Sequence, residues 1–312
     1  MVLEKSQPAK DDIAPLVIWR FIDGKPGHEN QTLGLIEALS KLTPVKVYEL
    51  EPEALGPAIK HILKKSFPLQ DRMPPSLIMG AGHQTHLSVL AAKKSVGGQS
   101  IILMKPSWPS ALFDYCIVPE HDGLSSSQRI ITTLGVINRI KPSNHHDDKQ
   151  GLILIGGPSA HYDWHDDALL ERISMILKQD DIHWSLSTSR RTPASFIEKL
   201  KLLPSEQLTL YLAEETQSDW LPKQLLNAGK VWITEDSVSM VYEALSSGAD
   251  CGLLPVQRKK ESRVSAGVDR LIVAQRLTSF DDWMNTRQLV ANETPLNEAQ
   301  RVAEYLLAHV RP

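Results

Sequence analysis

Residues 230–256 read KVWITEDSVSMVYEALSSGADCGLLPV, and this stretch predicts a complete strand–helix–strand unit. The β-branched and aromatic side chains of residues 231–233 favour a buried parallel strand. The polar run at residues 234–237 supplies side chains that commonly cap the first turn of a helix. Apolar residues then recur at helical spacing until Gly248, which is expected to end the helix. Residues 251–256 should therefore form the next buried strand.

The start of this helix is a candidate site for a diphosphate. The first turn of a helix leaves backbone N–H groups unpaired, and the helix dipole is positive there. We expect the N–H groups near Ser237 and Val238 to face the anion. Glu243 lies six residues beyond Ser237, about 9 Å along a helix, which suits the ribose of the same nucleotide, and Ser239 shares its polar face. The alternative is an ordinary capped helix with a solvated Glu243.

Length and composition restrict the class of protein. A chain of 312 residues with 42% hydrophobic and 23% charged residues is typical of a globular protein with two domains. A net charge of -3 argues against a general nucleic-acid binder, which needs a basic face, although it leaves room for local basic patches. The only cysteines, Cys116 and Cys251, lie in apolar runs and are expected to be buried free thiols.

No targeting or membrane-spanning segment is predicted. Residues 1–12, MVLEKSQPAKDD, form a polar start that we expect to be disordered, and it lacks the apolar core of a secretory signal. No later run contains the 18 or more apolar residues of a membrane span. We expect a cytoplasmic protein, and peripheral contact with a membrane remains compatible with the sequence.

The chain alternates between strands and helices, which predicts two mostly parallel sheets covered on both faces. The polar stretch at residues 141–150 is interpreted as a linker between a first domain, residues 1–144, and a second, residues 145–296. A terminal helix at residues 297–312 should complete the first domain. Besides those of the opening unit, the expected strands are residues 16–22, 45–50, 75–80, 101–105, 115–119, 130–134, 151–155, 182–187 and 208–212.

Two turns of the first half carry histidine beside glycine at the carboxyl ends of predicted strands, where open α/β sheets bind ligands. In DGKPGHENQ, residues 23–31, His28 would sit near a helix start and could act as a general base, together with Asp23. The alternative is that these side chains only cap the helix. The turn GAGH follows the third strand. The residues that we assign to the acceptor side are Gly24, Gly27, Asn30, Gln31, Gly82 and His83.

Two turns of the second half are candidates for binding phosphate. GGPSAHY, residues 156–162, places glycines before a hydroxyl group. STSRRTP, residues 187–193, offers two guanidinium groups, although a solvated basic turn explains it equally well. The polar clusters at residues 145–148 and 163–167 are not interpreted as metal sites. The predicted donor-binding residues are Gly157, Ser159, Ser189, Arg190, Arg191, Glu235, Asp236, Ser237, Val238, Ser239, Glu243 and Lys260.

The motifs DGKPGHENQ, GGPSAHY, TSRRTP and TEDSVSMVYEA together resemble the mitochondrial fission Elm-type family, over residues 17–254. The resemblance implies a GT-B fold, in which two Rossmann-type domains face each other across a cleft. The chain is also distantly similar to the GT-B enzyme that adds N-acetylglucosamine to lipid-linked muramyl peptide. That similarity implies that Glu243 contacts the ribose and that His28 or Asp23 activates an acceptor hydroxyl. The turn here is DGKPGH rather than a run of glycines.

The sequence therefore favours a glycosyltransferase that takes a nucleotide-diphosphate sugar and an unidentified acceptor near the inner face of a membrane. We expect it to need no cofactor and no metal, because Arg190, Arg191 and Lys260 can neutralise a diphosphate. No obligate protein partner is evident. One alternative is a GT-B-shaped adaptor related to mitochondrial fission factors, and another is a sugar-nucleotide epimerase, which would need no acceptor.

Overall fold

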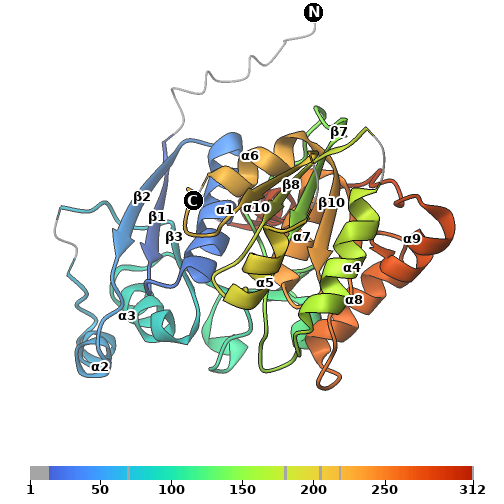
Figure 1. Cartoon of the computed structure of the whole chain (residues 1–312). Helices are drawn as coiled ribbons and strands as arrows, with labels where there is room; N and C mark the ends of the chain where they lie inside the picture. The colour runs from blue at the N-terminus through green and yellow to red at the C-terminus, as the bar shows by residue number, and fades with distance from the viewer. Residues whose placement is uncertain (1–13, 69–70, 179–180, 204–205, 218, 311–312) are drawn as a thin grey trace, which may run out of the picture. The chain divides into compact units, whose positions relative to one another are not determined.

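The chain folds into two compact units (Figure 1). The computed structural model describes residues 14–68, 71–178, 181–203, 206–217 and 219–310, so the amino-terminal run 1–12 lies outside the described residues. The first unit consists of Met1–Arg139 and Glu298–Pro312, and the second is Ile140–Asn297. This division falls a few residues before the boundary expected after residue 144.

The first unit contains a parallel six-stranded sheet in the order β2-β1-β3-β4-β5-β6. Its strands are β1 Leu16–Phe21, β2 Val45–Leu50, β3 Leu77–Ala81, β4 Gln99–Leu103, β5 Tyr115–Pro119 and β6 Ile130–Thr133. Its helices are α1 Pro26–Leu42, α2 Leu55–Lys64, α3 His86–Val96 and α10 Glu298–His309, with short 3₁₀ turns at His83–Thr85, Ser110–Leu112 and Glu120–Asp122.

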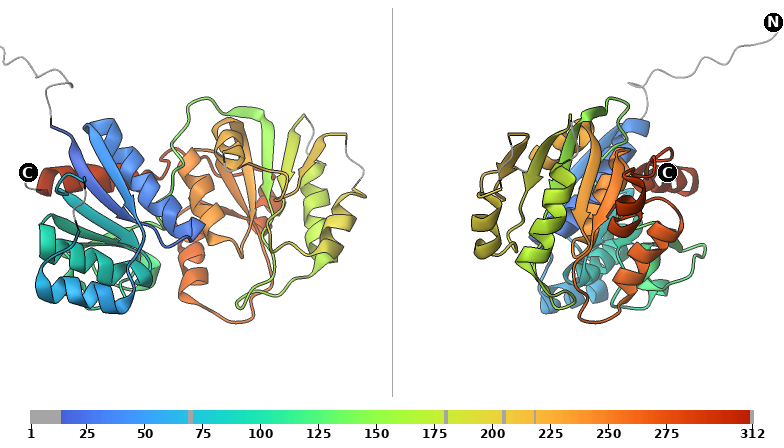
Figure 2. Two further views of the ribbon diagram at one scale, coloured as in Figure 1. Left: turned by 90° about the vertical axis from the view of Figure 1, so that its left-hand side faces the viewer. Right: turned by 45° about the vertical axis from the view of Figure 1, so that its right-hand side comes forward.

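Helices cover both faces of this sheet because its strands are apolar on both sides. On one face α1 and α10 pack against the sheet, with Leu35, Leu39, Val302 and Leu306 fully buried. Helices α1 and α10 lie side by side although about 250 residues separate them in sequence, as Figure 2 shows in blue and dark red. On the other face the core includes residues of α2 and α3.

The second unit contains a parallel six-stranded sheet in the order β12-β11-β10-β7-β8-β9. Trp184, Trp232 and Trp283 are fully buried in its core. Its strands are β7 Asp147–Leu154, β8 His183–Ser187, β9 Leu208–Tyr211, β10 Ala228–Thr234, β11 Asp250–Leu254 and β12 Thr278–Ser279. Its helices are α4 Asp166–Leu177, α5 Ala194–Leu200, α6 Trp220–Asn227, α7 Val238–Ser247, α8 Arg263–Val273 and α9 Phe280–Thr286.

Three local features differ from the sequence-based expectation. Residues 147–150, which we expected in the linker, form the exposed first half of β7. Asp147 pairs with β10 and Gln150 pairs with β8. Strand β12 and helix α9 were not predicted, because a two-residue strand leaves no periodicity to detect. The opening unit is present as β10, α7 and β11, and Gly248 ends α7 in the left-handed region with a φ of 98°.

Each sheet has a point where the strand order reverses, and in open α/β sheets ligands bind at the carboxyl ends of the strands there. In the first unit this point lies between β1 and β3, and in the second between β7 and β10. The parallel α/β class that we predicted is confirmed. Among the described helices, none combines the length and apolar character needed to cross a bilayer.

Candidate functional site

A cavity of about 520 Å³ opens at the carboxyl end of the second sheet. It lies beside the strand ends of β7 and β8 and the first turn of α7, so it occupies the ligand position expected for this topology. We call it the donor cavity, after the donor-binding role that the sequence predicts for several of its residues. Its lining residues are Leu154, Ser187, Thr188, Ser189, Arg190, Arg191, Ala213, Thr216, Gln217, Trp220, Leu221, Ser237 and Met240.

The polar turn before α7 holds the loop after β7 instead of capping the helix. The Gly156 N–H donates to Thr234 Oγ1 at 2.7 Å, and the Gly157 N–H donates to Asp236 Oδ2 at 2.9 Å. Ser237 occupies the N-cap position, but its side chain makes no capping hydrogen bond. The expectation that residues 234–237 cap α7 is therefore corrected, because Thr234 and Asp236 accept hydrogen bonds from a neighbouring loop and Ser237 makes no capping bond.

The first turn of α7 keeps free donors next to the cavity. The Ser237 N–H, which we expected to face an anion, donates instead to the Thr234 carbonyl at 3.1 Å. No described residue accepts a hydrogen bond from the N–H groups of Val238, Ser239 or Met240. These three groups and the positive end of the helix dipole make the start of α7 suitable for an anion.

The two neighbouring arginines differ in their surroundings. Arg191 donates to Asp236 Oδ2 at 2.7 Å and to the Gly157 carbonyl at 2.7 Å, so its guanidinium ties three segments together. The side chain of Asp236 is fully buried. Arg190 lines the same cavity, is exposed and has no carboxylate partner among the described residues. Among the described residues that line this cavity, Arg190 is therefore the cation with charge available for a ligand.

Three of the predicted donor-binding residues lie elsewhere or are already engaged. The carboxylate of Glu235 is buried, accepts a hydrogen bond from Tyr162 and pairs with Arg258. Ser159 shapes its own turn, because its hydroxyl accepts from the Tyr162 N–H. Lys260 is exposed in the segment after β11 and does not line the donor cavity. Nothing in this geometry gives these three residues a contact with the cavity.

Glu243 lies on α7 three residues beyond Met240, which lines the cavity. Its side chain is partly buried, so the alternative of a solvated Glu243 does not hold, while its contact with a ribose stays a prediction. Burial raises the pKa of Glu243 to about 7. No described residue donates a hydrogen bond to its carboxylate. Ligand hydroxyl groups would supply the missing donors.

In the first unit the turns after β1 and β3 meet around His28. Its Nδ1 lies 2.9 Å from Oδ2 of Asp23, whose side chain is fully buried. In the tautomer whose Nδ1–H donates to this carboxylate, Nε2 carries the lone pair, and no described residue forms a hydrogen bond with Nε2. Gly82 packs directly on the ring, because a Cβ at this position would lie 2.3 Å from Cε1 of His28. Asp23 thus positions the imidazole and is itself shielded.

A second cavity, of about 770 Å³, lies beside this pair, and Asp23, Gly24 and His83 line it. We call it the acceptor cavity, after the acceptor-side role that the sequence predicts for Gly24 and His83. Of the other predicted acceptor-side residues, Gly27 and Asn30 are exposed on the first turn of α1. Gln31 is only 8% exposed, so its side chain faces the interior instead.

Residues 26–310 match the family model described as "Mitochondrial fission ELM1". The chain belongs to this family. The family resemblance inferred from the four motifs is thereby confirmed. The family match extends to residue 310, whereas the resemblance was drawn only as far as residue 254.

A curated relative of this ELM1-family chain is an uncharacterized protein, RP120, of Rickettsia prowazekii (strain Madrid E). The two are 23% identical over 349 residues, which covers 93% of this chain and 97% of the relative. A structure of a candidate UDP-N-acetylglucosamine 2-epimerase from Listeria monocytogenes is similar, with 13% identity, a TM-score of 0.61 and 95% of each chain covered. The structure of the glycotransferase of kitacinnamycin is also similar, with 13% identity and a TM-score of 0.53. The match covers 96% of this chain and 100% of the glycotransferase chain. These similarities establish the GT-B type of fold.

Two residues of the ELM1-family chain escaped the sequence analysis. Arg20 is buried within β1, and its guanidinium donates to Thr32 Oγ1 at 2.8 Å and to the Glu29 carbonyl at 2.9 Å. It thereby fixes the start of α1, which carries His28. An arginine inside an apolar strand was the available signal. Trp220 lines the donor cavity from the start of α6, and no local pattern marks it.

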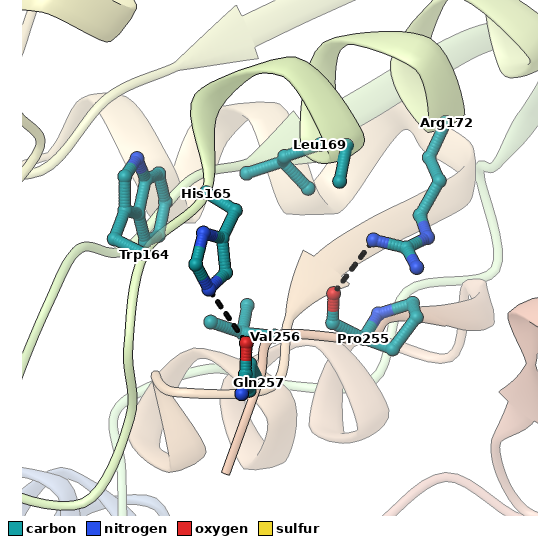
Figure 3. Close-up of a pocket in the computed structure, with 8 residues that line it drawn as sticks. Trp164, His165, Leu169, Arg172, Pro255, Val256 and Gln257 are labelled. Carbon is teal, nitrogen blue, oxygen red and sulfur yellow. Dashed lines mark hydrogen bonds between the residues drawn. The ribbon is translucent and has the colours of Figure 1, made fainter. Parts of the chain in front are cut away.

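A third cavity, of about 260 Å³, lies between the start of α4 and the segment after β11 (Figure 3). His165 and Gln257 form a hydrogen bond of 2.6 Å at its side, and Arg172 points towards the Pro255 carbonyl, 3.5 Å away. This cavity shares no lining residue with the donor cavity and contains no residue predicted from the motifs.

Proposed function

We propose that the protein binds a nucleotide-diphosphate sugar in the donor cavity and transfers the sugar to an acceptor hydroxyl. One observation carries this proposal: within the described part of the chain, helix α7 presents three unpaired N–H groups at its start and an unpartnered carboxylate, Glu243, one to two turns later. The first feature suits a diphosphate and the second suits the hydroxyls of a ribose. Their separation along the helix, about 8 Å, fits one nucleotide.

The charges of the cavity agree with this ligand. Arg190 would neutralise the diphosphate, and Arg191 would hold the loop of Gly157 in place through Asp236. Trp220 offers an apolar surface for a flat base in the same cavity. Fixed N–H donors and guanidinium groups can stabilise a leaving diphosphate, so we propose that no metal ion is required.

For the transfer step we propose that Nε2 of His28 accepts the proton of the acceptor hydroxyl. The acceptor oxygen then forms a bond to the anomeric carbon while the bond from that carbon to the diphosphate oxygen breaks. Asp23 would stabilise the resulting imidazolium through its hydrogen bond to Nδ1. The nucleoside diphosphate leaves with the bonding electron pair.

A second candidate is epimerisation of the sugar nucleotide. The observation that favours it is the fold similarity to the candidate epimerase of Listeria monocytogenes, which has the higher TM-score of the two structures described above. Both reactions use a nucleotide-diphosphate sugar. Only the transferase needs an acceptor.

The deciding experiment is a thermal-shift panel of nucleoside diphosphates and their sugars, with either EDTA or magnesium present. We expect one nucleotide series to raise the melting temperature equally in both conditions. The stabilising sugar nucleotide is then incubated with the protein alone and analysed for an epimer. Conversion in the absence of an acceptor would favour the epimerase, and a panel without any stabilising compound would refute nucleotide binding and favour an adaptor. Stabilisation only with magnesium would refute the metal-independent arrangement.

A further inference from the structure

Helix α2 exposes an apolar stripe that the first unit does not use for packing. Leu55, Ile59 and Leu63 are 61%, 43% and 78% exposed. Their spacing of four residues puts them on one face of the helix. Ala58 is the only buried residue of α2 among those described. Single exposed apolar side chains are common. Three of them along one face of a ten-residue helix indicate a surface that something else covers.

Lysines border this stripe. Lys60 and Lys64 follow Ile59 and Leu63 directly, and they form the adjacent row of the helix, while Lys65 is its C-cap residue. Residues 54–67 contain these three lysines and no carboxylate, whereas the whole chain has a net charge of -3. The positive charge is thus local to α2.

Aromatic and apolar groups continue the surface. Trp108 is 43% exposed and lines the acceptor cavity together with Leu55, so the two lie at the same rim. Leu112, four residues beyond Trp108, is 42% exposed. Tryptophan is favoured at the boundary between lipid headgroups and acyl chains. We call Leu55, Ile59, Leu63, Lys60, Lys64, Lys65 and Trp108 the α2 surface.

We propose that the α2 surface binds the face of a lipid bilayer that carries anionic headgroups. The apolar stripe would enter the boundary between headgroups and acyl chains, and the lysines would contact lipid phosphates, as in helices that lie in the plane of an interface. A protein partner fits less well, because lysine is depleted from protein–protein interfaces. This inference does not depend on the proposed function, since membrane binding can be measured without any nucleotide sugar.

One consequence concerns the acceptor cavity. Leu55 and Trp108 belong both to its lining and to the α2 surface. Binding of α2 to a bilayer would therefore place the mouth of this cavity at the level of the headgroups. A lipid-borne hydroxyl compound could then reach the cavity without leaving the membrane.

Vesicle sedimentation tests the proposal with the full-length protein. We expect binding to vesicles of phosphatidylcholine with phosphatidylglycerol and much weaker binding to phosphatidylcholine alone. The variant Leu63→Gln should weaken binding on the order of fivefold to tenfold. The double variant Lys60→Gln/Lys64→Gln should weaken it about 25-fold at low salt, at about fivefold for each lysine. Raising the salt concentration should remove most of the difference caused by the lysines.

Matched substitutions in the second unit serve as controls. Leu202 is 79% exposed and Lys178 is exposed, and neither belongs to the α2 surface. Leu202→Gln and Lys178→Gln should bind vesicles like the unchanged protein. Circular dichroism melting shows whether each variant is folded. We expect all of them to remain folded, because the substituted side chains are exposed.

Any of three results would overturn the proposal. The first is that the protein does not sediment with anionic vesicles, and the second is that Leu63→Gln and Leu202→Gln bind these vesicles equally. The third is that the protein forms a dimer in analytical ultracentrifugation that Leu63→Gln abolishes, while vesicle binding is absent. This third result would assign the α2 surface to another copy of the chain.

Discussion

At the scale of single residues, Glu243 gives the most direct test of the donor cavity. The substitution Glu243→Ala removes an acceptor for the ribose hydroxyls and should weaken binding of the stabilising nucleotide by about 1.5 to 3 kcal/mol. That corresponds to roughly tenfold or more in the dissociation constant. Calorimetric titration measures it, with Glu171→Ala as the control because Glu171 is an exposed glutamate of α4. Equal affinities for Glu243→Ala and the unchanged protein would show that Glu243 does not contact the nucleotide.

The same carboxyl group should make the stability of the unliganded protein depend on pH. Burial raises the pKa of Glu243 from the usual 4.5 to about 7, so the folded protein retains a proton that the unfolded chain loses. The contribution of this group to the free energy of unfolding is present below pH 4.5. It declines as the pH rises to 7, by up to about 3 kcal/mol. Urea unfolding of Glu243→Gln should show a flatter profile over this window.

Gly82 allows a second test at this scale, because it is the residue on which the ring of His28 rests. Gly82→Ala would introduce a Cβ 2.3 Å from His28 Cε1 and should displace the imidazole. Gly24 has a similar positive φ, 74° against 80°, but nothing lies within 4 Å of its Cβ position. Both alanine variants should therefore carry backbone strain of about 1 to 3 kcal/mol. Only Gly82→Ala should also shift the imidazole resonances of His28 in NMR spectra, and equal spectra for both would contradict the packing argument.

At the scale of elements, the loop after β7 and the turn before α7 are held together by Arg191. Arg191→Ala would leave the buried carboxylate of Asp236 without its cation and should destabilise the protein by about 2 to 4 kcal/mol. Arg190→Ala should change stability by less than about 0.5 kcal/mol, because Arg190 is exposed and unpaired within the described residues. It should instead weaken binding of the nucleoside diphosphate. Denaturant unfolding and calorimetry of both variants separate the two roles, and a reversal of the two results would refute them.

These contacts also explain what the sequence could and could not predict. Strands and helices were predictable, because apolar periodicity records which faces are buried. The contacts of the acidic side chains before α7 were not predictable, because a capping residue and a residue that holds a distant loop have the same chemistry. Glu235 is such a case, because its partner Arg258 lies 23 residues further along the chain. Trp220 reaches the donor cavity only through the arrangement of α6 in the folded unit.

At the scale of the whole molecule, the first unit is built from two separate stretches of chain. Val302, Ala303 and Leu306 of α10 are fully buried against the core that includes Leu35 and Leu39 of α1. Removing residues 298–312 should therefore destabilise the first unit strongly and leave the second nearly unchanged. Hydrogen exchange followed by mass spectrometry would show faster exchange in α1 and β3 but not in β10. Unchanged exchange in α1 would mean that α10 contributes little to this core.

The position of α10 in the chain also sets an order of assembly during synthesis. The ribosome produces the strands of the first unit first, yet the helix that covers one face of its sheet is made only after residues 140–297. At ordinary elongation rates this interval lasts roughly ten to thirty seconds. During that time the apolar face beside α1 remains uncovered, while the second unit, which is continuous in sequence, can complete its own core. The half of the protein that is translated first is thus the half whose core is completed last, once α10 has been made.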